Sequence, residues 1–131
     1  MCICDIINNG GLMAFPGELN INYYKGDTYE FSIYPKHADG SSMNLTDYTV
    51  KFYINQSRGT TVNSIECYSD IPTEGSSPNY VKCAITPAAG NQLDATKIYY
   101  YDVEITKAGT PYPYVYTLLN GTITITDQVS A

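Results

Sequence analysis

The chain has 131 residues, enough for one domain that buries roughly two-thirds of the surface its unfolded chain exposes. Thirteen acidic residues against seven basic ones give a formal net charge of −6, which argues against nucleic acid or an anionic membrane as a ligand, because both require clustered Lys and Arg. Fourteen Tyr with three Phe and no Trp favour β-strands, where an aromatic ring packs on a pleated face.

The first twelve residues lack both a basic start and a long apolar run. They therefore predict neither a secretory signal nor a membrane span, and we expect a protein that is made in a cytoplasm.

Seven strand-like runs then follow one another at the spacing of an all-β sandwich. They span residues 19–24, 28–34, 48–55, 62–68, 80–86, 98–107 and 112–126. Pro35 is expected to end the second run, and Gly40 to supply the positive φ of a tight turn after Asp39. Residues 69–78, rich in Pro, Gly and Ser, predict a mobile polar loop.

Two further features interrupt the strands. Residues 87–93 are the one stretch with a helical pattern: Pro87 suits a first turn and Leu93 offers a single core contact, so one or two turns are predicted. Asn120-Gly121 lies inside the last run, where we expect a bulge or kink.

The sixth run carries the clearest strand pattern, with residues alternating between a core-facing side and a water-facing side. The core-facing positions are Tyr99, Tyr101, Val103 and Ile105, and the water-facing ones are Tyr100, Asp102 and Glu104. Val50 and Phe52 of the third run are expected to join this core. Tyr99 also fits a tyrosine corner, in which the hydroxyl returns to the backbone a few residues upstream; the alternative is a plain core or surface Tyr.

The four cysteines, at positions 2, 4, 67 and 83, show no Cys-x-x-Cys spacing, and only one His accompanies them, which is a poor match to a zinc site. Cys67 and Cys83 are expected to be small buried side chains rather than a disulfide, because cytoplasmic proteins rarely keep disulfides.

No position predicts catalysis. His37 is the only histidine, and it shares one hairpin with Asp39 and two serines, whereas a hydrolytic triad needs a rigid frame. Asp102 and Glu104 point to the same outer face about 7 Å apart, but solvated charges on a sheet face without a cleft are their expected role. The remaining acidic residues show no calcium-loop spacing. We therefore expect no enzymatic activity, no metal and no cofactor.

Alternation sends several tyrosines outward, from the set Tyr23, Tyr24, Tyr34, Tyr53, Tyr100, Tyr112, Tyr114 and Tyr116. Outward aromatic residues on a small sandwich suit either a sugar-binding module or a protein–protein interface. The absence of Trp, the usual stacking platform for sugars, favours the interface, for which the candidates are Tyr53, Tyr100, Tyr112 and Tyr114.

Five short motifs resemble a known family. They are PGELNI at 16–21, KGDTYEF at 25–31, NLTDYTVK at 44–51, YYYDVEI at 99–105 and LNGTITI at 119–125. Together they look like small immunoglobulin-like structural proteins of tailed bacteriophages, and in particular like the N-terminal domain of phage baseplate upper proteins. Asp47 stands where the third motif of that family usually has Gly.

This resemblance, over about residues 16–126, implies an immunoglobulin-like β-sandwich of about seven antiparallel strands with one short helical turn. It also implies a non-enzymatic virion component, made in the host cytoplasm, that serves as an adaptor of the tail, neck or baseplate and anchors fibres or neighbouring subunits. Its partners would be other virion structural proteins, in multiple copies within a symmetric assembly. The alternatives are a capsid-decorating cement protein and a carbohydrate-binding module for surface attachment.

Residues 1–15 fall outside the resemblance and form a separate N-terminal arm before the sandwich domain of residues 16–131. An apolar arm carrying Ile3, Ile6 and Ile7 is seldom ordered when it is free. We therefore expect these residues to lie on a partner subunit, as in the addition of a strand to a neighbouring sheet.

Overall fold

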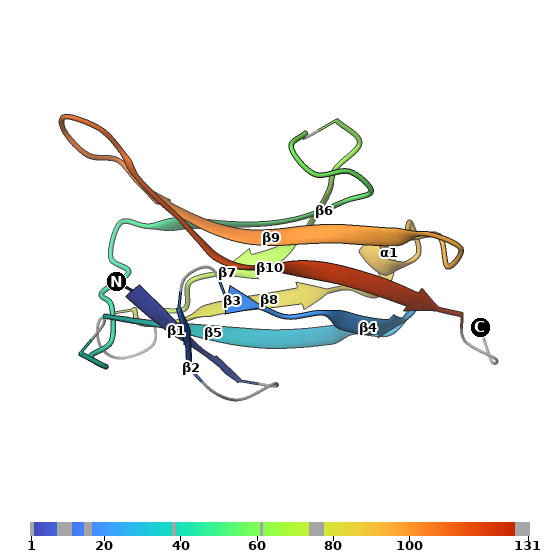
Figure 1. Cartoon of the computed structure of the whole chain (residues 1–131), viewed down its shortest axis with the longest axis horizontal. Coiled ribbons are helices and arrows are strands. Elements are labelled where there is room, and N and C mark those ends of the chain that lie inside the picture. The colour runs from blue at the N-terminus through green and yellow to red at the C-terminus, as the bar shows by residue number, and fades with distance from the viewer. Residues whose placement is uncertain are drawn as a thin grey trace.

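Figure 1 shows a computed structural model of the chain, which describes residues 2–7, 12–14, 17–37, 39–60, 62–73 and 78–127. Nearly all regular structure in these ranges is β-strand, which confirms the all-β class. The elements are β1 (Cys2–Ile7), β2 (Leu12–Ala14), β3 (Gly17–Glu18), β4 (Ile21–Tyr24), β5 (Tyr29–His37), β6 (Thr49–Asn55), β7 (Ile65–Asp70), β8 (Val81–Ile85), α1 (Pro87–Gly90), β9 (Ile98–Lys107) and β10 (Tyr114–Thr126).

The strands form one curled sheet that closes into two layers at β7. The first half of β7 pairs with β6, with Cys67 opposite Phe52, whereas its second half pairs with β8, with Tyr68 opposite Ala84. One layer therefore runs β2-β1-β5-β8-β7 and the other β7-β6-β9-β10, with β3 and β4 along the far edge of β10. This strand order is that of an immunoglobulin-like β-sandwich, as expected.

Not every strand is antiparallel, contrary to the expectation. β3 and β4 both run parallel to β10, with Gly17 opposite Leu119 and Ile21 opposite Ile123. Residues 17–24, which include β3 and β4, run along the edge of β10 in the same direction as β10. The chain then crosses to β5 in the other layer.

The core lies between the two layers and is rich in aromatic residues. The inward residues of β9 are all buried, which confirms the predicted alternation: Tyr99, Tyr101, Val103 and Ile105 are each at most 3% exposed. Phe52 is fully buried, and its ring meets Phe31 and Tyr101 edge-on, at centroid distances of 5.5 and 5.7 Å. Val50 differs from the expectation because it is only half-buried, next to the first residue of β6 at the end of the sandwich.

A buried hydrogen bond joins β9 to the edge strand. The Tyr101 hydroxyl donates to the carbonyl oxygen of Leu19 at 2.7 Å. Gly121 lies opposite Tyr101 on β10, and a Cβ at this position would overlap the same Leu19 carbonyl. Glycine is therefore required by the close approach of two backbones, and the bulge expected at Asn120-Gly121 is wrong. The register of β10 shifts instead between Thr117 and Leu119.

The corner between β8 and β9 confirms two local predictions. The backbone N–H of Asp94 donates to the Tyr99 hydroxyl oxygen at 2.8 Å, so Tyr99 makes a tyrosine corner in which its hydroxyl accepts. The predicted helical turn is α1, where the Thr86 hydroxyl oxygen accepts from the Ala89 N–H at 3.3 Å and Pro87 occupies the first turn. Leu93 enters the core as expected.

Pro35 does not end β5, contrary to the prediction. β8 begins only at Val81, opposite Ile33, so no residue of β8 lies beside Pro35 to need its missing N–H. The Pro35 carbonyl accepts from the Met43 N–H at 3.1 Å, and the strand continues to His37. Gly40 has the positive φ predicted for it, +90°.

Other strand ends differ by a few residues. β7 begins at Ile65 rather than residue 62, because Val62 and Asn63 form a turn in which Asn63 has a φ of +62°. β10 begins at Tyr114 rather than residue 112. Of the predicted mobile loop, residues 69 and 70 belong to β7, and residues 74–77 lie outside the described residues.

The N-terminal arm pairs with its own chain. β1 runs antiparallel to β5, which places Ile3, Ile6 and Ile7 opposite Lys36, Ile33 and Ser32. β2 in turn pairs with β1. The arm thus pairs with the sheet of its own chain, whereas the expectation placed it on the sheet of a partner subunit. Contact with a partner subunit remains a prediction.

Cys67 and Cys83 are free and buried, as predicted. Burial raises the pKa of the Cys67 thiol to about 12 and also raises that of Cys83. Both thiols therefore stay protonated at neutral pH and act as small apolar side chains.

Replacing Phe52 by Ala is expected to lower the free energy of unfolding by about 3–5 kcal/mol, because a fully buried ring is lost and a cavity remains. Urea unfolding of the variant and the parent measures the difference. Lys51→Ala, at an exposed position of the same strand, is the matched control and should stay within about 0.5 kcal/mol. An unchanged midpoint for Phe52→Ala would place the ring outside the core.

Asp47 occupies a strained turn position. The Tyr48 N–H donates to the Leu45 carbonyl at 3.1 Å, which closes a turn whose third residue, Asp47, has a φ of +66°. A type II turn needs a positive φ there and favours Gly. We expect Asp47→Gly to leave the stability unchanged or raise it by up to about 1 kcal/mol. Asp47→Val should lower it by about 1–2 kcal/mol. Thermal unfolding checks both, and equal stability of the two variants would argue against this turn.

Candidate functional site

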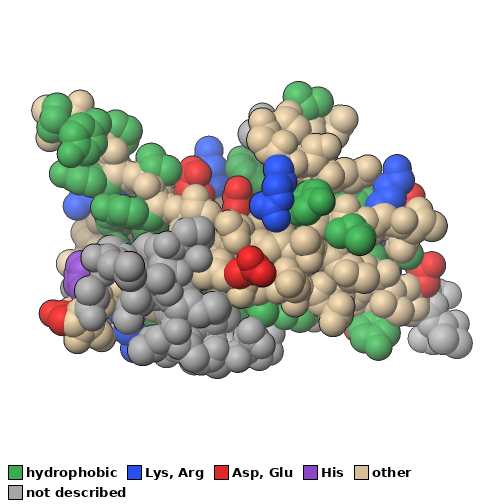
Figure 2. All heavy atoms as spheres, viewed as in Figure 1, with side chains coloured by type: hydrophobic (Ala, Val, Ile, Leu, Met, Phe, Trp, Pro, Cys, Tyr) green, Lys and Arg blue, Asp and Glu red, His purple; other side chains and the backbone are tan. Residues whose placement is uncertain are grey.

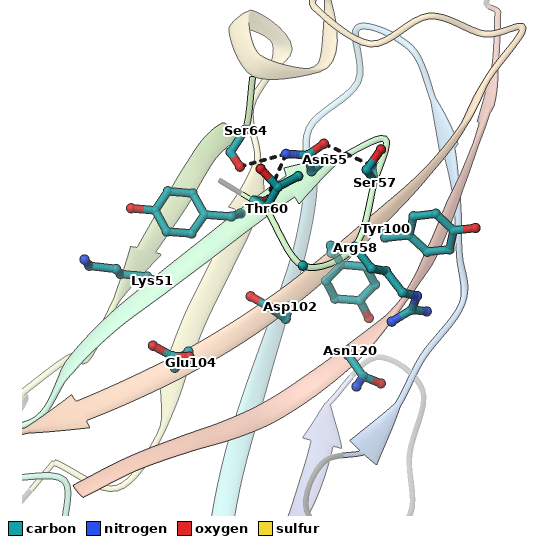
Figure 3. A pocket seen from close by; sticks show the side chains of 13 residues that line it. Lys51, Asn55, Ser57, Arg58, Thr60, Ser64, Tyr100, Asp102, Glu104 and Asn120 are labelled. Carbon is teal, nitrogen blue, oxygen red and sulfur yellow. Dashed lines mark hydrogen bonds between the residues drawn. The ribbon is translucent and has the colours of Figure 1, made fainter. Parts of the chain in front are cut away.

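A groove of about 450 Å³ lies on the outer face of β6, β9 and β10. Residues 57–60, which lie in the loop after β6, form its wall, and Figure 3 shows Arg58 reaching from this loop over the strands that carry Asp102 and Asn120. The volume falls within the range of small-molecule sites, about 300–1,000 Å³.

The register of three strands builds the floor of the groove. Tyr53 on β6 lies opposite Asp102 on β9, and Asp102 lies opposite Asn120 on β10, so the three form one row across the sheet. Lys51 and Glu104 form the next row. These side chains point outward because the residues before and after each of them on its strand point into the core. Directly opposed residues on paired strands have Cβ atoms about 4.5–5.5 Å apart, so the side chains of one row are close neighbours.

One side chain organises the wall. The Asn55 amide nitrogen donates to the Thr60 carbonyl at 3.2 Å, the Val62 carbonyl at 2.8 Å and the Ser64 hydroxyl oxygen at 3.0 Å. Its amide oxygen accepts from the Ser57 N–H at 3.0 Å (Figure 3). The loop is therefore fixed at the end of β6 by hydrogen bonds within its own segment, and the groove has a preformed wall.

The charges around the groove balance. Two cationic residues, Lys51 and Arg58, and two anionic ones, Asp102 and Glu104, line it. The Arg58 guanidinium carbon lies 4.4 Å from the centroid of the Tyr100 ring, a cation–π contact that holds the arginine over the sheet. The carboxyl of Asp102 is exposed at its tip, yet desolvation by the surrounding protein raises its pKa, and Arg58 opposes this with a smaller effect.

A second feature is the hairpin that joins β9 to β10, which projects beyond the body of the sandwich (Figure 1). All residues from 108 to 115 are exposed. Tyr112 is 62% exposed, Tyr114 40% and Val115 49%, and the two tyrosine rings meet edge-on with centroids 6.0 Å apart. Figure 2 shows hydrophobic side chains gathered on this projection. We call Tyr112, Tyr114 and Val115 the apolar tip.

The structure divides the interface residues predicted from sequence among three places. Tyr53 and Tyr100 line the groove, whereas Tyr112 and Tyr114 form the apolar tip. The three isoleucines of the arm lie on β1, at the edge of the other layer.

Tyr23, one of the tyrosines considered for the surface, belongs to the core and is 1% exposed. Its hydroxyl donates to the Asp27 carbonyl at 2.7 Å and accepts from the Gly26 N–H at 3.2 Å. A Cβ on Gly90 would overlap the ring, so α1 can pack there only because this residue is glycine.

Asp102 and Glu104 share the outer face as expected, but both line a groove, which was not expected. The sequence gives their common face but not the loop that stands beside it. Sequence reasoning also missed Arg58, Asn55 and Asn120. Only the pairing of β6 with β9 and of β9 with β10 brings them together, and the Ser-Arg-Gly loop between two strands was the one available signal.

The hairpin of His37 shows a local turn. The Asp39 carboxylate accepts from the Ser41 hydroxyl at 2.6 Å and from the Ser41 N–H at 2.9 Å. These bonds, and more weakly the charge of His37, lower the pKa of Asp39. Ser41 therefore donates its hydroxyl hydrogen bond to the Asp39 carboxylate and not to the His37 imidazole. The lack of enzymatic activity remains a prediction.

Within the described residues, no group of three His, Cys, Asp or Glu side chains gathers as a metal site would require. In the same part of the chain no helix is long and apolar enough to cross a membrane.

No family model matches the chain, and no curated protein matches its sequence. Among solved structures, murine CRIg is similar over 85% of this chain and 93% of its own, with 8% sequence identity and a TM-score of 0.40. AggA, the major subunit of aggregative adherence fimbriae type I from Escherichia coli, is similar over 96% of both chains, with 8% identity and a TM-score of 0.36. Likenesses of this strength carry no argument about function.

Proposed function

We propose that this chain is a non-enzymatic structural protein of a tailed bacteriophage particle. In this proposal it is an adaptor of the tail, neck or baseplate, made in the host cytoplasm, that joins neighbouring subunits or anchors fibres. The motif resemblance supplies the class of particle. The structural observation that supports it is the apolar tip, where a two-stranded projection holds Tyr112 and Tyr114 well clear of the sandwich.

The apolar tip suits a protein partner for energetic reasons. Tyr is enriched among the residues that dominate binding at protein interfaces, and a fully buried large apolar side chain contributes about 1.5–3 kcal/mol. Three such residues bury too little surface for a stable standard interface of about 1,600 Å². Several copies in a symmetric assembly offset this, because linked contacts strengthen one another.

The arm offers a second contact. Strands β5 to β10 form both layers of the sandwich, and β1 and β2 are added at the outer edge of β5. β1 adds backbone hydrogen bonds to β5, and the same pairing can be made with a second copy if the arms are exchanged. We propose that the arm joins subunits in this way in the particle.

A capsid-decorating cement protein would use the same tip and arm, and the position of the chain in the particle distinguishes it from a tail adaptor. A carbohydrate-binding module for surface attachment is favoured by a different observation, the groove. The apolar tip and the groove are separate surfaces, so the two functions are compatible in one chain.

The double variant Tyr112→Ser, Tyr114→Ser should fold normally but enter particles at least about tenfold less often than the parent, because two apolar anchors lose their contact area. The measurement is particle occupancy when the variant competes with the parent chain during assembly. Tyr24→Ser, at another exposed tyrosine, is the matched control and should compete equally. Equal occupancy of the double variant would remove the tip from the interface.

Deleting residues 1–12 should leave the sandwich folded, because β5 to β10 form both of its layers without β1 and β2. Particle occupancy should fall by orders of magnitude, since three aliphatic anchors contribute roughly 1.5–3 kcal/mol each before ordering costs. Circular dichroism tests the fold, and the same competition measures assembly. Undiminished occupancy would mean that the arm only completes the sheet of its own chain.

A further inference from the structure

We propose that the groove over β6, β9 and β10 is a binding site for a neutral carbohydrate, with Asp102 and Asn120 as the pair that holds its hydroxyl groups and Tyr53 as its stacking surface. This site goes beyond the proposed structural function and does not depend on it.

Asp102 and Asn120 carry the hydrogen-bonding part of the proposal. They are directly opposed on β9 and β10 and point to the same face. A carboxylate accepts several hydrogen bonds and a carboxamide both donates and accepts, which matches two neighbouring hydroxyl groups of a sugar ring. Within the described residues, neither side chain is used in a hydrogen bond to another protein group, and Arg58 is the charged neighbour of Asp102.

The aromatic part comes from the same row. Tyr53 lies on β6, which flanks β9 on the side away from β10. It is directly opposite Asp102 and half-buried in the groove. The apolar C–H face of a pyranose can cover its ring while the ring hydroxyls reach the carboxylate and the amide. Tyr100 has a different task, because its ring already supports Arg58 at 4.4 Å. A guanidinium held there keeps N–H donors for a ligand that enters beneath the loop.

The charge balance decides the class of sugar. Lys51 and Arg58 offset Asp102 and Glu104 among the residues that line the groove. A sulfated or carboxylated sugar would place its anion near two carboxylates, whereas a neutral sugar uses every one of these groups as a donor or an acceptor. The overall charge of −6 adds to the disadvantage of an anionic ligand.

The preformed wall lowers the cost of binding. Asn55 holds Ser57, Thr60, Val62 and Ser64 through four hydrogen bonds, so these parts of the loop need not be ordered when a ligand enters. Asn55 is accordingly a positioning residue. It touches the groove, but its amide is fully used by the loop.

The test uses the full chain, labelled for NMR, and a panel of neutral hexose and N-acetylhexosamine mono- and disaccharides. A sialylated and a sulfated disaccharide form the anionic arm of the panel. At least one neutral sugar should shift the amide signals of Tyr53, Tyr100, Asp102 and Asn120 in a saturable manner, with a Kd in the range of about 10 µM to 10 mM that weakly bound small ligands show. Stronger binding of an acidic sugar, or no saturable shift at the groove with any neutral one, would overturn the proposal.

Matched variants localise the site. Asp102→Asn keeps the size of the side chain and should weaken binding by roughly tenfold or more, because it removes a charged acceptor. Tyr53→Phe should retain binding and Tyr53→Ala should lose it, since the ring face and not the hydroxyl is required. Glu66→Gln is the control, at the next position of the same row and outside the groove. Unchanged affinity in both Asp102→Asn and Tyr53→Ala would place the sugar elsewhere.

The same proteins separate this site from the structural function. Asp102→Asn should enter particles as well as the parent, and the double variant of the apolar tip should still bind the sugar. Loss of sugar binding in the tip variant would show that the ligand does not occupy the groove.

Discussion

The hydrogen bond from the Tyr101 hydroxyl to the Leu19 carbonyl is the constraint on which the rest of the sandwich depends. It fixes which residues of β9 face inward, because a slip of one residue would withdraw Tyr101 and send Asp102 into the core. Burial raises the pKa of Tyr101 far above its usual value, so the donor keeps its proton at any physiological pH. Gly121 lets the Leu19 carbonyl come close enough to accept. Because Tyr101 is held inward, Asp102 must point outward, where it joins Tyr53 and Asn120 in the row that forms the floor of the groove.

The N-terminal segment protects both edges of the sandwich. β1 covers β5 in one layer, and β3 and β4 cover β10 in the other. Exposed strand edges invite pairing with other chains, and covering them is a common defence. An assembly built from this domain therefore has two routes. It can use side-chain surfaces such as the apolar tip, or it can uncover β5 by moving the arm.

The features that could be predicted from the sequence are local ones. The alternation of β9, the corner at Tyr99 and the turn after Pro87 each depend on a few neighbouring residues. The groove could not be predicted, because Tyr53 and Asn120 are 67 positions apart and meet only through the register of three strands. Pro35 shows the same limit: whether proline ends a strand depends on whether a partner lies beside it, which the strand itself does not reveal.

The bulge in β10 explains how one pair of strands supplies both surfaces. Leu118 and Leu119 are consecutive and both fully buried, which regular alternation forbids and a register shift between Thr117 and Leu119 permits. Below the bulge, β10 lies in the sheet and contributes Asn120 to the groove. Above it, β3 no longer lies beside β10, and residues 114–117 of β10 pair only with β9. A bulge strengthens twist, so the hairpin turns away from the sheet at this point, and the apolar tip is a surface separate from the groove.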